Sequence, residues 1–466
     1  MKLKHNILVF LVSVYATMSL ALATTASANA EEPSAGVNKI SQAFHTLLNT
    51  TSTTEISSAV SVIESQWQNA YVPQVLETIA NSRNFIVFQG MINLLAEKTG
   101  ENYGRNINEW YRWFWNQEES VTSDYANFKA DIYKKIDPKF EKYFRDRQTS
   151  ARIRLDEIRW GGVLQDGIPP LRNPEMISVK KARYLDDDNI VFGLEINGDA
   201  RAYPKRILAW HEMFTDTVGG VDIAGVYCTL CGTIIPYKTK ANGVKHRLGT
   251  SGFLYRSNKL MYDQATQSLW STIKGEPVVG PLVDKGIKLE FLSIVTTTWG
   301  EWKKRHPDTT VLSLKTGHVR DYGEGVAYQD YFSNDRLMFN TPFNDDRLQN
   351  KQEVLALRFA ASPKEQLAID TDFLNATPLY KNKIGQQKFI VLTDKSGANR
   401  VYDPEGINFV SYDQDSTVID AKGEHWLLKE DRLVKSNSNQ HLKRLPYHRA
   451  FWFGWHAAFP ETQLIK

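Results

Sequence analysis

The chain has 466 residues, with 56 basic and 53 acidic side chains and a formal net charge of +3. A balance so close to neutral gives no electrostatic case for binding nucleic acid or an anionic membrane surface. The length suits two or three domains.

The first thirty residues have the pattern of a secretory signal. Lys2 and Lys4 precede a largely apolar run from Ile7 to Leu22, and the small-residue site Ala28-Asn29-Ala30 follows. We therefore expect cleavage after Ala30 and export of the mature chain to a periplasm or to the exterior. A retained membrane anchor is the alternative, which the shortness of the apolar run disfavours. No later stretch is apolar enough to span a bilayer, so no membrane span is expected in the mature chain.

Residues 31–150 are predicted to form a helical domain. Segments 37–49, 55–70 and 84–100 carry apolar residues at helical spacing and are separated by polar residues and glycine. Several short amphipathic helices in series resemble HEAT-type repeats, although an irregular bundle fits the same uneven pattern. Because helical arrays commonly present a surface to other proteins, a protein partner of this region is expected.

Residues 151–466 are predicted to form a β-rich α+β domain, which makes the whole chain an α+β multidomain protein with an N-terminal all-α region. Short strand-like runs alternate with turns, and Asn197-Gly198 predicts a hairpin because both residues tolerate positive φ. The best helical segments here are 205–216 and 298–308. No glycine-rich phosphate-binding motif follows a strand, so no nucleotide is expected.

Cys228 and Cys231 are the only cysteines of the chain and lie in the stretch VYCTLCGT. A strand runs into a turn at Gly232, so the two thiols can form a disulfide, bind a metal ion or carry out redox chemistry. A structural disulfide is a serious alternative in an oxidising compartment, but so short a loop gains little chain-entropy stabilisation. The β-branched segment after the pair predicts a strand, whereas thioredoxin-type pairs begin a helix.

His211 and Glu212 lie upstream of the cysteines on the predicted helix 205–216, which we expect to end at Gly219-Gly220. The next strand can then return the chain, so that His211 meets the sulfur atoms. Cys228, Cys231 and His211, with Glu212 as a fourth ligand or base, would form a Cys2His-type site for zinc or copper. An open coordination position would support hydrolytic or redox chemistry, and a closed one a structural role. The alternative is that His211 is a satisfied or exposed histidine that binds no metal.

Segment 249–282 mixes polar and aromatic residues in the manner of a ligand pocket. The candidate lining residues for a small ligand or glycan are Ser251, Tyr255, Arg256, Tyr262, Asp263 and Trp270. The alternative is a hairpin whose side chains pack against one another. Ser251 is expected in a turn, since its surroundings do not match a nucleophile elbow.

Five of these short runs together resemble the bacterial domain-of-unknown-function family 3179 (DUF3179). They are His-Glu at 211–212, Tyr-Cys-x-x-Cys-Gly-Thr at 227–233, Ser-Gly-x-x-Tyr at 251–255, Tyr-Asp at 262–263 and Leu-Trp-Ser at 269–271. The resemblance covers about residues 166–346, with a further similar run at 450–462, and Thr229 stands where the family usually has proline. The resemblance implies that the His-Glu pair and the cysteine pair belong to one set of motifs. It implies no particular activity.

We therefore predict an exported protein with a Cys2His-type metal site in its β-rich domain. A thiol–disulfide oxidoreductase that uses the cysteine pair is one alternative. A module that binds a small ligand, a glycan or a protein partner is the other.

Overall fold

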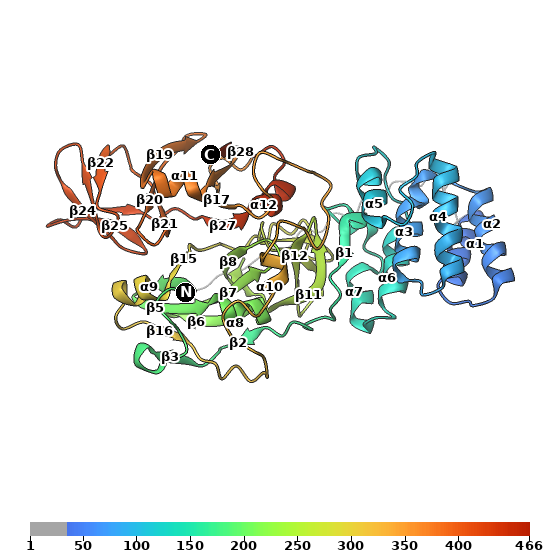
Figure 1. Ribbon diagram of the computed structural model, residues 1–466, viewed down its shortest axis with the longest axis horizontal. Helices are drawn as coiled ribbons and strands as arrows, with labels where there is room; N and C mark the ends of the chain where they lie inside the picture. Colours follow the sequence, from blue (N-terminus) through green and yellow to red (C-terminus); the bar gives the residue numbers. More distant parts are fainter. Residues whose placement is uncertain (1–34) are drawn as a thin grey trace, which may run out of the picture.

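The computed structural model describes residues 35–466, with side chains described from residue 39. The expected signal and its cleavage site at Ala30 lie outside the described residues. Helices occupy one end of the molecule and strands dominate the rest (Figure 1), which confirms the α+β multidomain fold class. Between residues 35 and 466, no helix is long and apolar enough to cross a bilayer.

Between residues 35 and 144 the structure has seven α-helices, and side chains that cap their first turns fix where several of them begin. Ser52 and Asn84 accept hydrogen bonds from the first-turn amides of α2 and α4. The helices are α1 (Ala35–Leu47), α2 (Thr53–Ser65), α3 (Val72–Asn81), α4 (Phe85–Thr99), α5 (Ile107–Trp115), α6 (Tyr125–Tyr133) and α7 (Glu141–Phe144). A HEAT-like relationship among them stays a prediction.

The helical region shares one hydrophobic core with the first sheet of the β-rich region. Phe253 lies within about 6 Å of the rings of Phe140, Tyr143 and Phe144, so helices and sheet are packed together. The sheet has the order β1-β11-β12-β13-β14. Its strands are β1 (Ile158–Trp160), β11 (Leu248–Tyr255), β12 (Asn258–Asp263), β13 (Leu269–Ser271) and β14 (Glu276–Val279).

Two further sheets complete the central part of the chain. One has the order β15-β4-β5-β16-β3 and the other β2-β6-β7-β8, while β9 (Lys240–Ala241) and β10 (Val244–Lys245) form a small ribbon. The strands are β2 (Leu171–Arg172), β3 (Met176–Ser178), β4 (Ile190–Ile196), β5 (Asp199–Pro204), β6 (Met213–Val218), β7 (Val221–Cys228), β8 (Thr233–Lys238), β15 (Val295–Thr298) and β16 (Thr310–Leu312). The predicted hairpin at Asn197-Gly198 is confirmed, with φ of 51° and 83°.

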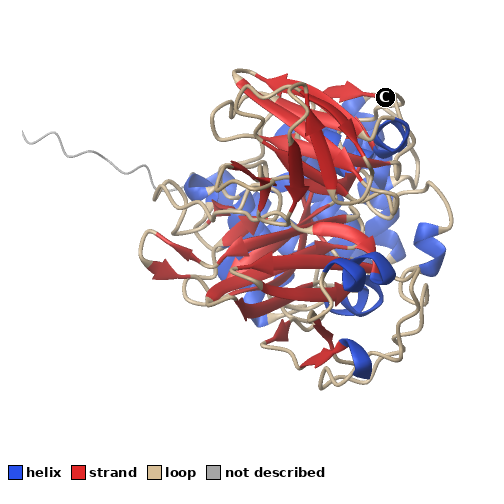
Figure 2. Cartoon of the chain, turned by 90° about the vertical axis from the view of Figure 1, so that its left-hand side faces the viewer, coloured by secondary structure: helices blue, strands red, loops and turns tan. Residues whose placement is uncertain are grey.

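The C-terminal part adds three sheets, with the orders β27-β17-β18-β28, β19-β20-β21 and β22-β23-β24-β25-β26. The strands are β17 (Glu353–Arg358), β18 (Gln366–Asp370), β19 (Leu379–Ile384), β20 (Gln387–Thr393), β21 (Asn399–Tyr402), β22 (Phe409–Tyr412), β23 (Thr417–Asp420), β24 (His425–Leu428), β25 (Arg432–Lys435), β26 (His441–Lys443), β27 (His448–Phe451) and β28 (Gln463–Ile465). Two short helices, α11 (Thr371–Ala376) and α12 (Trp452–Ala458), belong to this part. Its strands stack above those of the central part (Figure 2).

The predicted helix 205–216 is about half as long as expected. Helix α8 (Lys205–His211) ends when Glu212 adopts a left-handed conformation with φ of 53°, and Met213 then begins β6. From Met213 onward the segment pairs residue by residue with β7, so sheet formation overrides the helical pattern. The predicted segment 298–308 does form a helix, α9 (Trp299–Arg305), which Thr298 caps.

Candidate functional site

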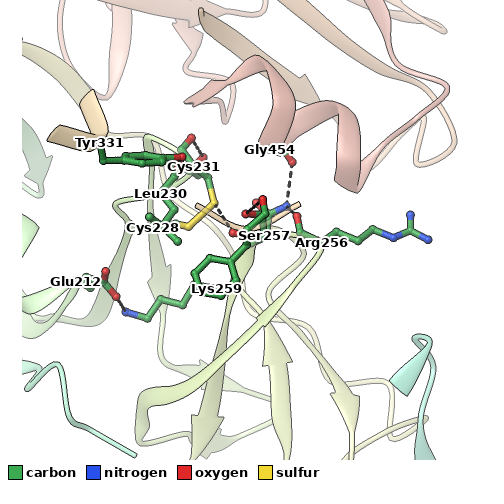
Figure 3. Close-up of a disulfide and its surroundings, with 12 residues drawn as sticks. Glu212, Cys228, Leu230, Cys231, Arg256, Ser257, Lys259, Tyr331 and Gly454 are labelled. Atoms are coloured by element: carbon green, nitrogen blue, oxygen red, sulfur yellow. Dashed lines mark hydrogen bonds and ion pairs between the residues drawn. A yellow bond between two sulfur atoms is a disulfide. The ribbon is translucent and has the colours of Figure 1, made fainter. Parts of the chain in front are cut away.

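Cys228 and Cys231 form a disulfide at the turn between β7 and β8 (Figure 3). Cys228 is the last residue of β7, and its carbonyl accepts a hydrogen bond from the Cys231 amide at 3.1 Å. Gly232 then reverses the chain with φ of 59°, and a Cβ built there would lie 2.8 Å from the Phe451 ring. The turn therefore requires glycine both for its backbone conformation and for its packing.

The disulfide is enclosed by apolar side chains. Cys228 is 3% exposed and Cys231 is fully buried, in a cluster that includes Leu230 and Phe451. The Tyr331 hydroxyl, from the short helix α10 (Gln329–Phe332), donates to the Leu230 carbonyl at 2.8 Å and holds the cover in place. Water is thus largely excluded from the sulfur atoms, and an incoming reactant meets this cover first.

A two-residue hairpin places a carbonyl group against the second sulfur. Arg256 and Ser257 connect β11 to β12, and both have positive φ, at 49° and 64°. The Ser257 carbonyl oxygen lies 3.3 Å from Cys231 Sγ. In the reduced state it would accept a hydrogen bond from the Cys231 thiol, which favours the protonated form of that cysteine. Cys228, which is slightly more exposed, is then the better thiolate.

A buried acid–base pair lies on the Cys228 side of the disulfide (Figure 3). The Lys259 ammonium on β12 donates to the Glu212 carboxylate at 2.5 Å, and the Tyr328 hydroxyl donates to the same carboxylate at 3.3 Å. Burial lowers the pKa of Lys259, an effect that the charge of Glu212 opposes. The Glu212 carbonyl also accepts a hydrogen bond from the Tyr227 amide, next to Cys228.

The backbone at Glu212 is strained. A residue other than glycine with φ of 53° costs free energy, and such positions cluster at functional sites. This conformation turns the chain sharply between α8 and β6, so that the Glu212 side chain points to Lys259 while His211 makes contacts of its own.

His211 is buried at a different place. Its Nδ1 lies 2.9 Å from the Pro169 carbonyl, so Nδ1 carries the proton, and its Nε2 accepts a hydrogen bond from the Tyr322 hydroxyl at 2.6 Å. Burial lowers the pKa of His211 to about 4, although the hydrogen bond to Pro169 opposes the shift. Tyr322 and His318 line an open pocket of about 410 Å³ beside it.

Of the four predicted metal ligands, the structure joins the two cysteines in a disulfide, pairs Glu212 with Lys259 and gives His211 other partners. Across residues 35–466, no group of three or more His, Cys, Asp and Glu side chains is arranged to hold a metal ion. In the disulfide the sulfur atoms are bonded to each other. The Cys2His set stays a prediction for the reduced protein.

Five of the six predicted pocket residues lie in β11, β12 and β13, and Arg256 lies in the turn between β11 and β12. Most of the six make internal contacts. Ser251 lies in β11 at a bulge instead of the expected turn, and its hydroxyl donates to the Leu260 carbonyl at 2.6 Å. Tyr262 donates to Asp166 at 2.5 Å, and Asp263 accepts from Trp270 at 3.4 Å.

The other two pocket candidates lie at the β11–β12 hairpin. Arg256 pairs with the buried Glu157 and donates to the Ala457 carbonyl, and Tyr255 is half-buried beside it. Their role in binding a ligand stays a prediction.

Sequence reasoning missed three residues of the site: Lys259, Tyr328 and Tyr331. One signal in the sequence could have identified Lys259, because it is a charged residue within the strand Asn258–Asp263, which is buried throughout. Tyr328 and Tyr331 lie far along the chain in an irregular segment, and only the tertiary structure brings them to the cysteines.

A family model described as "Protein of unknown function (DUF3179)" matches residues 165–462. The matched range contains the disulfide, the Glu212–Lys259 pair and every strand of the C-terminal sheets except β28. No curated protein and no solved structure matches the chain.

Proposed function

The chain belongs to the DUF3179 family, whose function is unknown, and we propose that Cys228 and Cys231 form a redox centre that exchanges two electrons with an external thiol. One observation carries the proposal: the disulfide lies beside a buried Lys259–Glu212 pair (Figure 3) and under a cover of side chains. Buried titratable groups next to a reactive group are typical of active sites, because their burial and charges tune proton affinity.

The exchange proceeds by thiolate attack on the more exposed sulfur. An external thiolate bonds to Cys228, the disulfide breaks, and Cys231 leaves as a thiolate. This thiolate takes up a proton, and the resulting thiol donates a hydrogen bond to the Ser257 carbonyl. A second thiol of the reactant then attacks the mixed disulfide. The products are an oxidised reactant disulfide and two protein thiols. In the reverse reaction the two protein thiols reduce an external disulfide and the Cys228–Cys231 disulfide forms again.

Lys259 supports the reverse reaction, in which Cys228 must act as the attacking thiolate. An ammonium group close to a cysteine lowers the pKa of its thiol. Glu212 and Tyr328 hold the ammonium in place through their contacts. These contacts support roles for Lys259 in stabilising the Cys228 thiolate and for Glu212 in orienting the ammonium.

The short loop supports a chemical role over a structural one. A disulfide across two intervening residues restricts the unfolded chain only slightly, by about 2 kcal/mol in the loop-entropy estimate. Export to an oxidising compartment, which stays a prediction, would supply partners with thiols and disulfides.

The Cys2His-type site for zinc or copper is the second candidate, and the chemistry of its donors suits either metal. A metal would require the reduced cysteines, and His211 would have to exchange its contacts with Pro169 and Tyr322 for the ion. These contacts favour the redox centre. A protein partner of the helical region is compatible with both.

Elemental analysis and a thiol count on protein purified without chelator separate the two candidates. The redox centre predicts no stoichiometric metal, and it predicts two thiols that appear on mild reduction of the folded protein and disappear on reoxidation. Stoichiometric zinc or copper, lost in a variant with both cysteines changed to serine, would replace the proposal with the metal site.

A further inference from the structure

Two sheets of the β-rich region have the same arrangement. The order β15-β4-β5-β16 in the central part matches β27-β17-β18-β28 in the C-terminal part. In both, the outer strand and the second strand are antiparallel, the second and third strands are antiparallel, and the last contact is parallel. In both, a helix and then three antiparallel strands follow the third strand along the chain: α8 with β6–β8, and α11 with β19–β21.

The strand registers agree as well. Val191 faces Pro204 in the first sheet, and Val354 faces Asp370 in the second. Between the outer and second strands, the pair Val295–Gly193 of the first sheet corresponds to His448–Ala356 of the second. In the parallel contact, Thr310–Arg201 corresponds to Gln463–Leu367. A single set of equivalent positions thus accounts for three strand contacts in each sheet.

Hydrogen bonds outside the ladders repeat at these equivalent positions. Trp302 donates from its indole to the Thr309 hydroxyl at 2.9 Å, and Trp455 donates to Thr462 at the same distance. Two backbone bonds at the helix starts also correspond, from Trp299 to Asn189 at 2.8 Å and from Trp452 to Gln352 at 2.9 Å. Agreement of strand order, register and side-chain contacts is more than a shared architecture requires.

The turn that carries the disulfide has a counterpart without cysteines. Tyr227 donates to the Glu212 carbonyl at 2.8 Å, and Thr393 donates to the Pro378 carbonyl at 2.9 Å. Cys228 therefore corresponds to Asp394.

A left-handed glycine closes each turn, Gly232 in the first and Gly397 in the second. Asp394 accepts hydrogen bonds from the Ser396 amide at 2.9 Å and the Ser396 hydroxyl at 2.6 Å. A carboxylate and a hydroxyl thus hold the second turn, whereas a disulfide holds the first.

Each turn packs against the other part of the chain. The Phe451 amide at the end of β27 donates to the Cys231 carbonyl at 2.7 Å, and a Cβ built on Gly454 of α12 would lie 3.0 Å from the Cys231 Cβ. Reciprocally, the Thr297 hydroxyl of β15 lies 3.0 Å from the Ser396 hydroxyl. Each part thus places the end of an outer strand, β27 or β15, against the turn of the other part, as the subunits of a two-fold symmetric dimer do.

We propose that residues 187–313 and 350–466 are two copies of one structural unit, and that the second copy controls the reactivity of the disulfide in the first. The first copy alone has the cysteines, and Pro378 in the second copy stands where Glu212 stands in the first. The second copy packs the junction of β27 and α12 against the disulfide turn. Within this junction Gly454 is a positioning residue for Cys231. A physiological role for this control rests on the proposed redox function, whereas the repeated architecture and the control itself stand without it.

Gly454 is the point at which this control can be tested. A methyl group at a position 3.0 Å from Cys231 Cβ forces the turn or the helix to shift, and a strained disulfide is reduced more easily. We expect Gly454→Ala to speed reduction of the folded full-length chain by dithiothreitol roughly fivefold, because the added strain favours opening of the disulfide. Alkylation followed by mass spectrometry measures the rate.

Glu301 supplies the matched control, because it occupies in α9 the position that Gly454 occupies in α12. Its carboxylate pairs with Arg305, away from the cysteines. Glu301→Ala should reduce at the wild-type rate. If Gly454→Ala does not fold, Asn258→Ala replaces it, since Asn258 donates to the Gly454 carbonyl at 2.9 Å and its loss frees α12. A folded variant of either kind that reduces at the wild-type rate would overturn the proposal.

The result is independent of whether the pair serves a physiological reaction. Dithiothreitol reduces any accessible disulfide, so a changed rate in Gly454→Ala supports control by the second copy even if the protein exchanges with no thiol at cellular potentials. The latter outcome would remove the proposed function alone.

Discussion

The Lys259 ammonium donates to the Glu212 carboxylate at 2.5 Å, with both side chains almost excluded from solvent. Burying such a pair costs desolvation free energy that mutual attraction often fails to offset, so a buried ion pair is weak evidence for a gain in stability. Glu212 also has a strained backbone. Two unfavourable features at one residue beside the disulfide fit a role in chemistry better than a role in folding.

Removal of one partner tests this pair. We expect Lys259→Met to lower the free energy of unfolding by about 3–5 kcal/mol, because Glu212 is left as an unpaired buried charge. The double variant Lys259→Met/Glu212→Gln should recover much of this loss. In the reduced double variant, the rate of alkylation of Cys228 should rise only at higher pH than in the wild type, since the ammonium no longer stabilises the thiolate. An unchanged pH profile would exclude this role for Lys259.

Replacing both cysteines tests how much the disulfide contributes to folding. For Cys228→Ser/Cys231→Ser we expect a loss of no more than about 2 kcal/mol in the free energy of unfolding, as the closed loop is very short. Denaturant titration of the oxidised wild type and of the variant measures the difference. A much larger loss would indicate that the disulfide is mainly structural.

The cover over the disulfide should limit its reduction. Tyr331→Ala removes a ring from the cluster around Cys228 and Cys231 and the hydrogen bond to Leu230, so the folded protein should react faster with dithiothreitol. Tyr331→Phe retains the ring and loses only the hydrogen bond, so its rate should lie between those of the wild type and Tyr331→Ala. Equal rates in all three proteins would place the access route elsewhere.

The repeated Trp–Thr hydrogen bonds predict matched energetic effects. Thr309→Val and Thr462→Val each leave a buried indole N–H without its acceptor, and each should lower the free energy of unfolding by about 1–3 kcal/mol. Chemical denaturation of the two variants under the same conditions provides the comparison. A large loss in one variant and none in the other would show that the two positions are not energetically equivalent.

His211 should make stability fall in mild acid. Its pKa is lowered from 6.5 to about 4 in the folded protein, so the unfolded chain takes up the proton first as the pH falls. The stability from neutral His211 is therefore present above about pH 6.5 and is lost progressively toward pH 4. His211→Gln should show a shallower decline over this window in denaturant titrations, and a decline as steep as that of the wild type would contradict the assignment.

Local signals in the sequence predicted much of the fold and part of the site. The fold class, the Asn197-Gly198 hairpin and the strands on both sides of the cysteines are confirmed, because each depends on neighbouring residues. The expected helix 205–216 is wrong in its second half because strand pairing from Met213 onward overrides helical spacing. That early end also gives His211 partners of its own.

The remainder depends on contacts that no local pattern encodes. Lys259 and Tyr328 reach Glu212 from a strand and from an irregular segment far along the chain. The two copies share framework contacts such as Trp302–Thr309 and Trp455–Thr462 but differ at the cysteines and at Glu212, so the residues that attract attention in the sequence are those that the second copy lacks.

A redox titration of the folded full-length protein tests the central claim most directly. Samples are equilibrated in glutathione buffers of graded potential, the thiols are trapped by alkylation, and the masses are measured beside a circular dichroism spectrum. The redox centre predicts one reversible two-electron transition at Cys228 and Cys231, above about −300 mV, with the folded spectrum retained. A disulfide that stays oxidised until the protein unfolds would contradict the account.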